Sequence, residues 1–241
     1  SMFTSRAPSI EDLYSDGPHL GVYNYEIGLP ELGAEHTYGL EGSLGYMIDK
    51  AELKITSYQN YSPNYHLSKV MGAGYEPGAD WIEWGSGSAG WLYIYQMSGL
   101  EVYIHGYESE FDYTLNDIIS FGGSFSATRG KNLTDSSSLY YMPPDRILLS
   151  TEINLLPFSI NLMHKKVFNQ NRIGLYESAT PGYETYNLIG TYTIRNSLTI
   201  HKIILQIDNV FDRKYYNHLS RIKSIMPEKG RNIGLQYRLN F

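Results

Sequence analysis

The sequence predicts an all-β chain whose antiparallel strands form an up-and-down transmembrane β-barrel, and three observations support this. Segments of alternating apolar and polar residues recur along its 241 residues, which is typical of strands with one apolar face. The chain holds 23 Tyr and 23 Gly. Tyrosine suits strands that lie between an apolar and an aqueous environment, and glycine suits tight turns. Its charged fraction is only 18%, yet its mean hydropathy is −0.33. Alternating strands explain both values, because their polar half offsets their apolar half in an average.

The clearest segment is the last one, residues 232–241. Its odd positions are apolar, its even positions are polar, and it ends on Phe241. In a soluble sandwich the apolar face would point inward, whereas in an outer-membrane barrel it points to lipid. A terminal aromatic residue in phase with the apolar face favours the membrane, because aromatic girdles lie at membrane interfaces.

Composition excludes several classes of function. No run of about 18 apolar residues exists, so no membrane helix is expected. A net charge of −6 and the lack of a basic cluster beyond Lys165-Lys166 argue against a nucleic-acid partner. The absence of cysteine excludes disulfides and thiolate metal sites. No nucleophile elbow, zinc-protease motif or phosphate loop is present, so we do not expect an enzyme.

The first third of the chain mixes loops and strands. Residues 3–35 are rich in Pro and Gly, which excludes a regular helix or a central strand and predicts a strand end followed by a long structured loop. Strands are then expected at residues 37–48 and 53–61, around the tight turn Asp49-Lys50. Residues 62–90 show no sustained period, and we expect a functional or flexible loop there.

The rest of the chain repeats one pattern, in which short and long connections alternate. Further strands are expected at residues 92–111, 119–128, 147–155, 158–162, 185–194, 203–207 and 232–241. The short turns are expected at 49–50, 115–117, 156–157 and 196–197, and the long loops at 62–90, 130–144, 169–182 and 211–230. Antiparallel strands place alternate connections at opposite ends, so all short turns share one end. That sorting is typical of transmembrane barrels, with short periplasmic turns and long extracellular loops.

Several local motifs, in order, resemble the TonB-dependent outer-membrane receptor family. The strongest is Ile-Asp-Asn-Val-Phe-Asp-Arg-Lys-Tyr-Tyr at residues 207–216, followed by Pro-Glu-Lys-Gly-Arg-Asn-Ile at residues 227–233 and the terminal Phe241. The other matches are Arg6-Ala7-Pro8-Ser9, Tyr25-Glu26-Ile27-Gly28, Leu29-Pro30-Glu31-Leu32 with Glu35, and Gly106-Tyr107-Glu108-Ser109-Glu110.

The resemblance implies a 22-stranded barrel with an N-terminal plug. Such a receptor imports a scarce nutrient, namely a ferric siderophore, haem, cobalamin or a metal ion, with energy from the TonB complex. This chain supplies only about ten strands and shows no plug, TonB-contacting motif or signal peptide. We therefore expect residues 1–241 to be the C-terminal part of the barrel in the bacterial outer membrane. Alone it should not transport, because open sheet edges are not tolerated in lipid.

The partners follow from the same resemblance. They are the TonB complex through the missing plug, the barrel-assembly machinery through the C-terminal strand with Phe241 as its recognition signal, outer-membrane lipid, and a small-molecule ligand. No resident cofactor is expected, since a ferric chelate, haem or metal would be cargo.

Ligand contacts are expected on the long-loop side and in the upper lumen. His19, between the motifs at residues 6–9 and 29–32, resembles in its placement the iron-ligating histidine of haem receptors. It is a candidate haem or metal ligand, and a merely solvated loop histidine is the alternative. The loop residues that could stack on a ligand or donate nitrogen and oxygen ligands are Tyr65, His66, Asp80, Trp81, Glu83 and Trp84. For these, an exposed loop with aromatic anchors is the alternative.

The strand phases also place acidic residues on the lumen wall. The residues concerned are Glu41, Glu108, Glu110 and Glu152. We expect them to be hydrogen-bonding partners of Arg129 or Arg146 rather than a metal site.

Two other classes remain open. One is a self-contained small outer-membrane barrel, either an enzyme or an adhesin; as an enzyme it would need a cluster such as Asp with His or Ser with His at its outer rim. A soluble β protein that binds carbohydrate through Tyr and Trp would turn its apolar faces inward and would not sort its turn lengths. The sequence does not identify the ligand.

Overall fold

A computed structural model gives the fold of residues 1–22, 24–71, 81–83 and 91–241. The strands are β1 (Met2–Arg6), β2 (Asp16–His19), β3 (Asn24–Ile27), β4 (Glu35–Ile48), β5 (Ala51–Val70), β6 (Trp81–Glu83), β7 (Trp91–Thr114), β8 (Ile119–Asn132), β9 (Arg146–Leu155), β10 (Phe158–Val167), β11 (Tyr183–Arg195), β12 (Ile200–Asp208) and β13 (Asn232–Asn240). The helical elements are α1 (Ile10–Tyr14) and the 3-10 turn η1 (Leu20–Val22).

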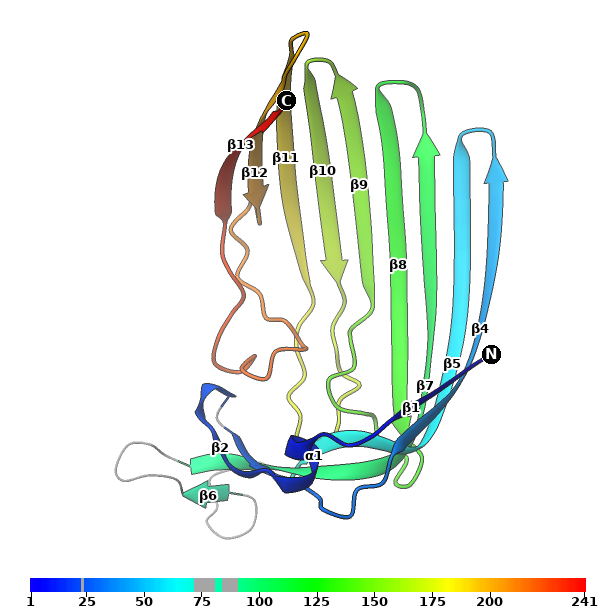
Figure 1. Ribbon diagram of the computed structural model, residues 1–241, viewed down its shortest axis with the longest axis vertical. Coiled ribbons are helices and arrows are strands. Elements are labelled where there is room, and N and C mark those ends of the chain that lie inside the picture. The colour runs from blue at the N-terminus through cyan, green and yellow to red at the C-terminus, as the bar shows by residue number, and fades with distance from the viewer. Residues whose placement is uncertain (23, 72–80, 84–90) are drawn as a thin grey trace.

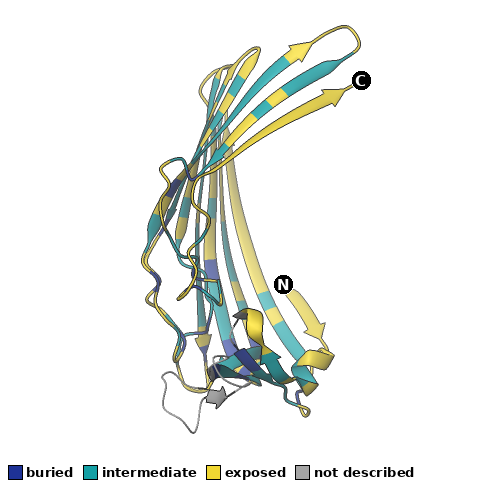
Figure 2. Ribbon diagram, turned by 90° about the vertical axis from the view of Figure 1, so that its left-hand side faces the viewer, coloured by how far each residue is buried: buried dark blue, intermediate teal, exposed yellow. Residues whose placement is uncertain are grey.

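Ten strands form one continuous antiparallel path, in the order β1-β4-β5-β7-β8-β9-β10-β11-β12-β13. This confirms the predicted up-and-down β architecture, and β2, β3 and β6 join the sheet outside this path. β1 and β13 end the path and do not pair with each other among the described residues. The sheet is therefore an open, curved wall (Figure 2).

The connections that the structure describes are sorted as predicted, with the short turns at one end of the wall and the long loops at the other (Figure 1). Strands β9 and β10 have 10 residues each, which is the length that a tilted strand needs to cross a bilayer. β5 and β7 have 20 and 24 residues and extend well past their neighbours at the long-loop end (Figure 1).

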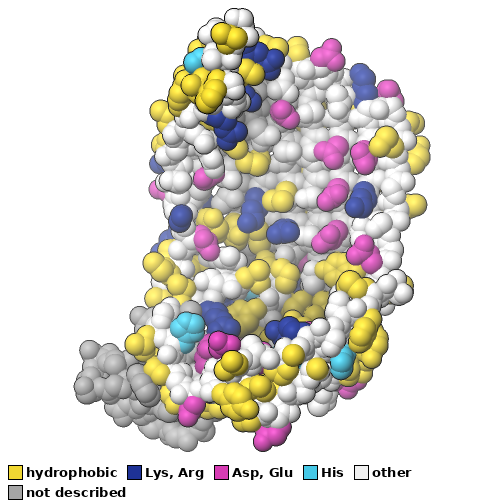
Figure 3. Space-filling model, in the orientation of Figure 1, with side chains coloured by type: hydrophobic (Ala, Val, Ile, Leu, Met, Phe, Trp, Pro, Cys, Tyr) yellow, Lys and Arg dark blue, Asp and Glu magenta, His cyan; other side chains and the backbone are white. Residues whose placement is uncertain are grey.

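The register gives the two faces of the wall opposite characters. Glu108 and Glu110 of β7 lie opposite Thr56 and Lys54 of β5, on the concave face, where acidic and basic side chains are visible (Figure 3). The alternate positions carry exposed apolar side chains, such as Leu235 at 75% exposure. A soluble protein would bury such a face, so this exposure favours contact with lipid.

Buried side chains gather at the long-loop end (Figure 2). One cluster contains Val70, Tyr95 and Tyr140, and a second contains Leu100, Val102 and Leu139. The loops therefore pack on the extended ends of β5 and β7 and form a core of their own.

Three predicted boundaries were wrong. β5 continues to Val70 instead of ending near Tyr61, because a bulge between Ser62 and Tyr65 accommodates Pro63 and lets pairing with β7 resume. The expected loop at residues 62–90 thus begins as strand, although much of it lies outside the described residues. The turn after β11 spans residues 196–199 rather than two residues, and the Asn196 N–H donates to the Thr199 carbonyl (2.9 Å).

The N-terminal segment contains a short helix, α1, where the density of Pro and Gly predicted no regular helix. α1 follows Pro8 and begins at the cap Ser9, whose hydroxyl accepts the Asp12 N–H while the Asp12 carboxylate accepts the Ser9 N–H, each at 3.0 Å. This reciprocal cap stabilises a five-residue helix between a proline and the following strand. No helix in the described part of the chain is long and apolar enough to span a membrane.

Candidate functional site at the long-loop end

His19 lies at the end of β2, at the long-loop end. Its Nδ1 is 3.4 Å from Glu26 Oε1 on the paired strand β3, and its side chain is 61% exposed. Glu26 also accepts a hydrogen bond from Arg221 (3.0 Å), which comes from the loop after β12. His19 therefore belongs to an exposed charged group, and its role as a haem or metal ligand stays a prediction.

Tyr65 and His66 lie within β5 and not in a loop. Tyr65 packs against the cluster of Leu100, Val102 and Leu139. The His66 ring is fully buried, with Nε2 2.8 Å from the Gly33 carbonyl oxygen, and the His66 backbone N–H donates to Glu35 (3.0 Å). The structure places His66 as a tie to the chain entering β4. It is not on an exposed loop surface.

The structure says less about the other four candidate ligand-binding residues of this loop. Trp81 and Glu83 are the ends of β6, whose backbone pairs with Tyr93 and Trp91 of β7. Asp80 and Trp84 lie outside the described residues.

One cavity of the loop end has a volume of about 170 Å³. It is lined by Asn24, Val70, Tyr93, Tyr95, Tyr141, Tyr176, Glu177, Ser178, Arg221, Lys223, Ser224 and Ile225. These residues come from β3, β5, β7 and the loops after β8, β10 and β12. We call this cavity the loop pocket, and its lining combines aromatic hydroxyls with two cations.

Aromatic and cationic groups are paired within the loop pocket. The Arg221 guanidinium lies over the Tyr95 ring (5.8 Å to its centre), and the Lys223 ammonium lies over the Tyr141 ring (5.4 Å). The Tyr95 and Tyr141 hydroxyls are 3.0 Å apart. Burial, followed by this hydrogen bond, raises the pKa of Tyr141. Tyr141 is therefore a neutral phenol at any physiological pH.

One polar group in the lining lacks a partner. Asn24 is 2% exposed, and among the described residues its Nδ2 has no hydrogen-bond partner. A buried amide donor without a partner costs about 1–3 kcal/mol. A ligand oxygen in the pocket would remove that cost.

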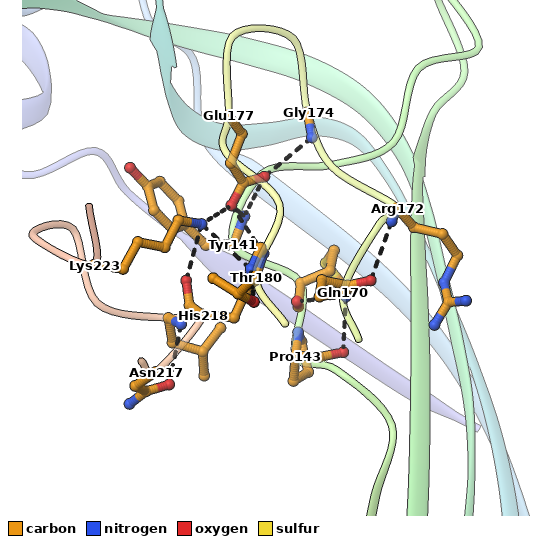
Figure 4. Close-up of polar contacts among 12 residues, drawn as sticks. Tyr141, Pro143, Gln170, Arg172, Gly174, Glu177, Thr180, Asn217, His218 and Lys223 are labelled. Carbon is orange, nitrogen blue, oxygen red and sulfur yellow. Dashed lines mark hydrogen bonds and ion pairs between the residues drawn. The ribbon is translucent and has the colours of Figure 1, made fainter. Parts of the chain in front are cut away.

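A buried ion cluster (Figure 4) contains Glu177 and Lys223, which also line the loop pocket. Glu177 Oε1 is 2.8 Å from Lys223 Nζ and 3.0 Å from His218 Nε2. The exposed fractions of these side chains are 3%, 6% and 0%. His218 Nδ1 lies 2.9 Å from the Thr180 hydroxyl, and the Lys223 ammonium also donates to the His218 carbonyl (3.1 Å). The cluster thus joins the loop after β10 to the loop after β12.

Glu177 is ionised despite its burial. Burial alone would raise the pKa of Glu177, but hydrogen bonds from His218, Lys223 and the Gly174 N–H outweigh it and lower the pKa to about 2. Burial also lowers the pKa of Lys223, although Glu177 opposes this change. The stable form of the cluster at neutral pH is therefore a carboxylate held by several donors.

Backbone contacts extend the cluster to a third loop. The Tyr141 N–H donates to Glu177 (3.2 Å), which brings in the loop after β8. The fully buried Gln170 donates to the carbonyls of Met142 (2.9 Å) and Pro143 (3.3 Å) and accepts the Arg172 N–H (3.2 Å). Three loops are therefore fixed together behind the loop pocket.

The sequence did not point to these residues. Glu177, His218, Arg221 and Lys223 lie in two loops separated by a whole hairpin, and no motif spacing relates them. Only the predicted sorting of the loops to one end implied that they could meet.

The expected ion pairs on the wall were not those found. The predicted acidic positions do share the concave face, but Arg129 binds Asp145 (Nη2 to Oδ2, 2.7 Å) and Arg146 donates to Ser126 (2.9 Å). Arg129 has the opposite strand phase from Glu108, so it points to the convex face and cannot reach the lumen acids.

No known family sequence profile matches the chain. Solved structures with a similar fold are the copper transporter OprC (TM-score 0.76, 21% identity), the ferric enterobactin receptor PfeA from Pseudomonas aeruginosa with the R480A substitution and enterobactin bound (0.66, 19%) and the siderophore receptor PirA from Acinetobacter baumannii (0.63, 14%). Each match covers 98% of this chain but only 35%, 37% and 37% of those chains. The chain therefore has the fold of the barrel wall of TonB-dependent outer-membrane receptors and spans about a third of their length.

Proposed function

We propose that residues 1–241 are the C-terminal part of the barrel of a TonB-dependent nutrient uptake receptor in the bacterial outer membrane. The observation that carries this proposal is the sorted wall. Its convex face is apolar, its concave face is charged, and its long loops build a pocket at one end. An uptake receptor needs these three properties, whereas a catalytic role would need a reactive constellation.

The lining of the loop pocket favours a ferric chelate with aromatic and hydrogen-bond-accepting groups as cargo. Tyrosine rings offer stacking surfaces, the free Asn24 amide offers a donor, and Arg221 and Lys223 offer further donors, although Glu26 and Glu177 offset their charges. Among the described residues, no three His, Asp or Glu side chains lie together as a metal-binding group. The pocket therefore suits a chelated metal better than a bare ion. Two of the similar structures are a ferric enterobactin receptor and a siderophore receptor.

The proposed partners lie outside this chain. The TonB complex would engage the part of the receptor that precedes residue 1. The barrel-assembly machinery would recognise the last strand and Phe241, whose side chain is fully exposed at the end of β13.

The test is the binding and uptake of labelled ferric chelates by the full-length receptor in cells that lack other iron receptors. Arg221→Gln is the pocket variant, and Arg238→Gln, on the concave face of β13 far from the loops, is the matched control. Losing one charge-assisted contact should weaken binding about ten-fold or more, while the control should bind as wild type. Ferric chelate uptake that is unaffected by deletion of the receptor or of TonB would refute the proposal.

A further inference from the structure

The buried ion cluster fixes a short turn at the long-loop end that carries two exposed apolar side chains. Glu177 closes this turn, because its backbone N–H donates to the Gly174 carbonyl (3.1 Å) and its carboxylate accepts the Gly174 N–H (3.0 Å) (Figure 4). Leu175 and Tyr176 lie between these two residues and are 61% and 49% exposed. The ion cluster therefore holds this apolar pair at the surface.

A second turn with an apolar pair follows Lys223, another member of the ion cluster. The backbone N–H groups of Ile225 and Met226 both donate to the Ile222 carbonyl (2.9 Å each). Ile225 and Met226 are each 61% exposed. Since Tyr176 and Ile225 both line the loop pocket, the two apolar pairs meet at its edge.

The residues of these two pairs form what we call the apolar rim, namely Leu175, Tyr176, Ile225 and Met226. Single exposed apolar side chains are common on protein surfaces and need no explanation. A contiguous group beside a pocket is different, because exposed apolar patches mark interaction sites. The loop pocket therefore opens onto an apolar surface that the ion cluster holds in place.

The interior of the loop pocket, in contrast, is polar and electrically balanced. Arg221 pairs with Glu26 (3.0 Å), and Lys223 pairs with Glu177 (2.8 Å). The Asn24 amide nitrogen, which has no hydrogen-bond partner among the described residues, is available to an acceptor atom. The interior thus suits a neutral head group that accepts hydrogen bonds.

We propose that the loop pocket and the apolar rim together bind an amphiphilic cargo, whose neutral chelating head accepts a hydrogen bond from Asn24 and whose acyl chain lies on the rim. This inference rests on the proposed function, because it specifies the chemistry of the cargo at the same pocket. Continuity of pocket and rim identifies the occupant. A hydrophilic chelate would leave the rim in water, and a protein docked on the rim would leave the Asn24 amide, 2% exposed, without a partner.

The test compares two ferric chelates that differ only in their tails. The probe is a linear trihydroxamate chelator whose terminal amine carries either a dodecanoyl or an acetyl group, so that both iron complexes are neutral. Binding of each radiolabelled complex to the full-length receptor is measured in lipid nanodiscs, and binding to empty nanodiscs is subtracted.

The rim variant is Leu175→Ser with Ile225→Ser, and the matched control is Ile10→Ser with Leu133→Ser. The control removes two exposed apolar side chains that do not line the loop pocket. Asn24→Leu is the head-group variant, because it removes the free amide.

Burial of about two methylene groups on the rim should make wild type bind the dodecanoyl chelate about ten-fold more tightly than the acetyl chelate. The rim variant should lose this preference and keep its affinity for the acetyl chelate, while the control should resemble wild type. Asn24→Leu should weaken binding of both chelates about five-fold, because their head group is the same. If the rim variant fails to assemble, Met226→Ser serves as the second variant, with a smaller loss of the same preference.

Equal affinity of wild type for the two chelates would overturn this proposal and leave the uptake function standing. An equal loss of preference in the control and the rim variant would also overturn it. So would a rim variant that keeps the preference but loses cross-linking between receptor copies, since the rim would then be an interface between copies of the chain. Binding of neither chelate would overturn the proposed cargo site and this inference together, so the two failures are distinguishable.

Discussion

Replacing Glu177 by Gln should release the loops at the extracellular end while leaving the barrel wall intact. The substitution keeps the size of the side chain but removes the charge that faces Lys223 at 2.8 Å. Lys223 would remain 6% exposed without a counter-charge. Breaking a buried pair from one side costs about 3–5 kcal/mol.

The pKa of Glu177 gives a second estimate of that cost. Its decrease from an ordinary 4.5 to about 2 corresponds to about 3 kcal/mol of preference of the folded loops for the carboxylate. The two estimates overlap, so we expect a local destabilisation of about 3 kcal/mol.

The assay is amide hydrogen exchange on the full-length receptor in detergent. A loss of about 3 kcal/mol should increase exchange about 100-fold in residues 168–182 and 209–231, because these amides exchange through local opening. Amides in β9 to β12 should not change, because their ladder bonds do not involve Glu177.

Two further variants test whether the unpaired buried charge of Lys223 causes the destabilisation. Glu184→Gln is the matched control, since its pair with Lys166 is 43% exposed on both sides and should cost at most about 1 kcal/mol. Glu177→Gln combined with Lys223→Met should recover much of the protection, because no unpaired charge remains buried. Unchanged exchange in Glu177→Gln, or a double variant as labile as the single one, would refute the reasoning.

Two other predictions follow from the same structure. The pKa of Glu177 is lower in the folded state, so its stabilisation is complete above pH about 4.5 and is lost as the pH falls towards 2; loop exchange should rise in that window in wild type and much less in Glu177→Gln. Gly106→Ala should lower the folded yield, since a Cβ at Gly106 would collide with the Tyr58 ring and the Ala127 carbonyl, at a cost of about 1–3 kcal/mol. Gly45→Ala, on the same face with open space, is its control, and gel mobility before and after heating reports folding; equal yields would contradict the prediction.

The wall could be predicted from sequence because it depends on local information. Alternating apolar and polar residues identify the two faces of each strand. The lengths of the connections alone predicted which strand ends lie at the same end of the wall. The segment from Phe158 to Leu162 shows this well, since its apolar positions are the convex ones in the structure.

The candidate site could not be predicted in the same way, because it depends on contacts between loops. Tyr and Trp in residues 62–90 drew attention by composition, yet His66 is a buried tie and the pocket lies among other residues. Nothing local marks Glu177 as different from any loop acid, since its burial results from packing against His218 and Lys223. The end of β5 was predicted too early for a related reason. Pro63 would end an isolated strand, but pairing with β7 resumes beyond the bulge between Ser62 and Tyr65.

The most direct test of the proposed membrane wall is the accessibility of neighbouring positions on the last strand. This chain has no cysteine, so Leu235→Cys and Gln236→Cys each introduce one thiol on opposite faces of β13. In intact outer membranes, Leu235→Cys should react with a lipid-soluble maleimide and resist a charged one, while Gln236→Cys should react with the charged reagent. Equal reaction of both positions with the charged reagent, or the reverse preference, would contradict an apolar convex face in lipid and a polar concave face in water.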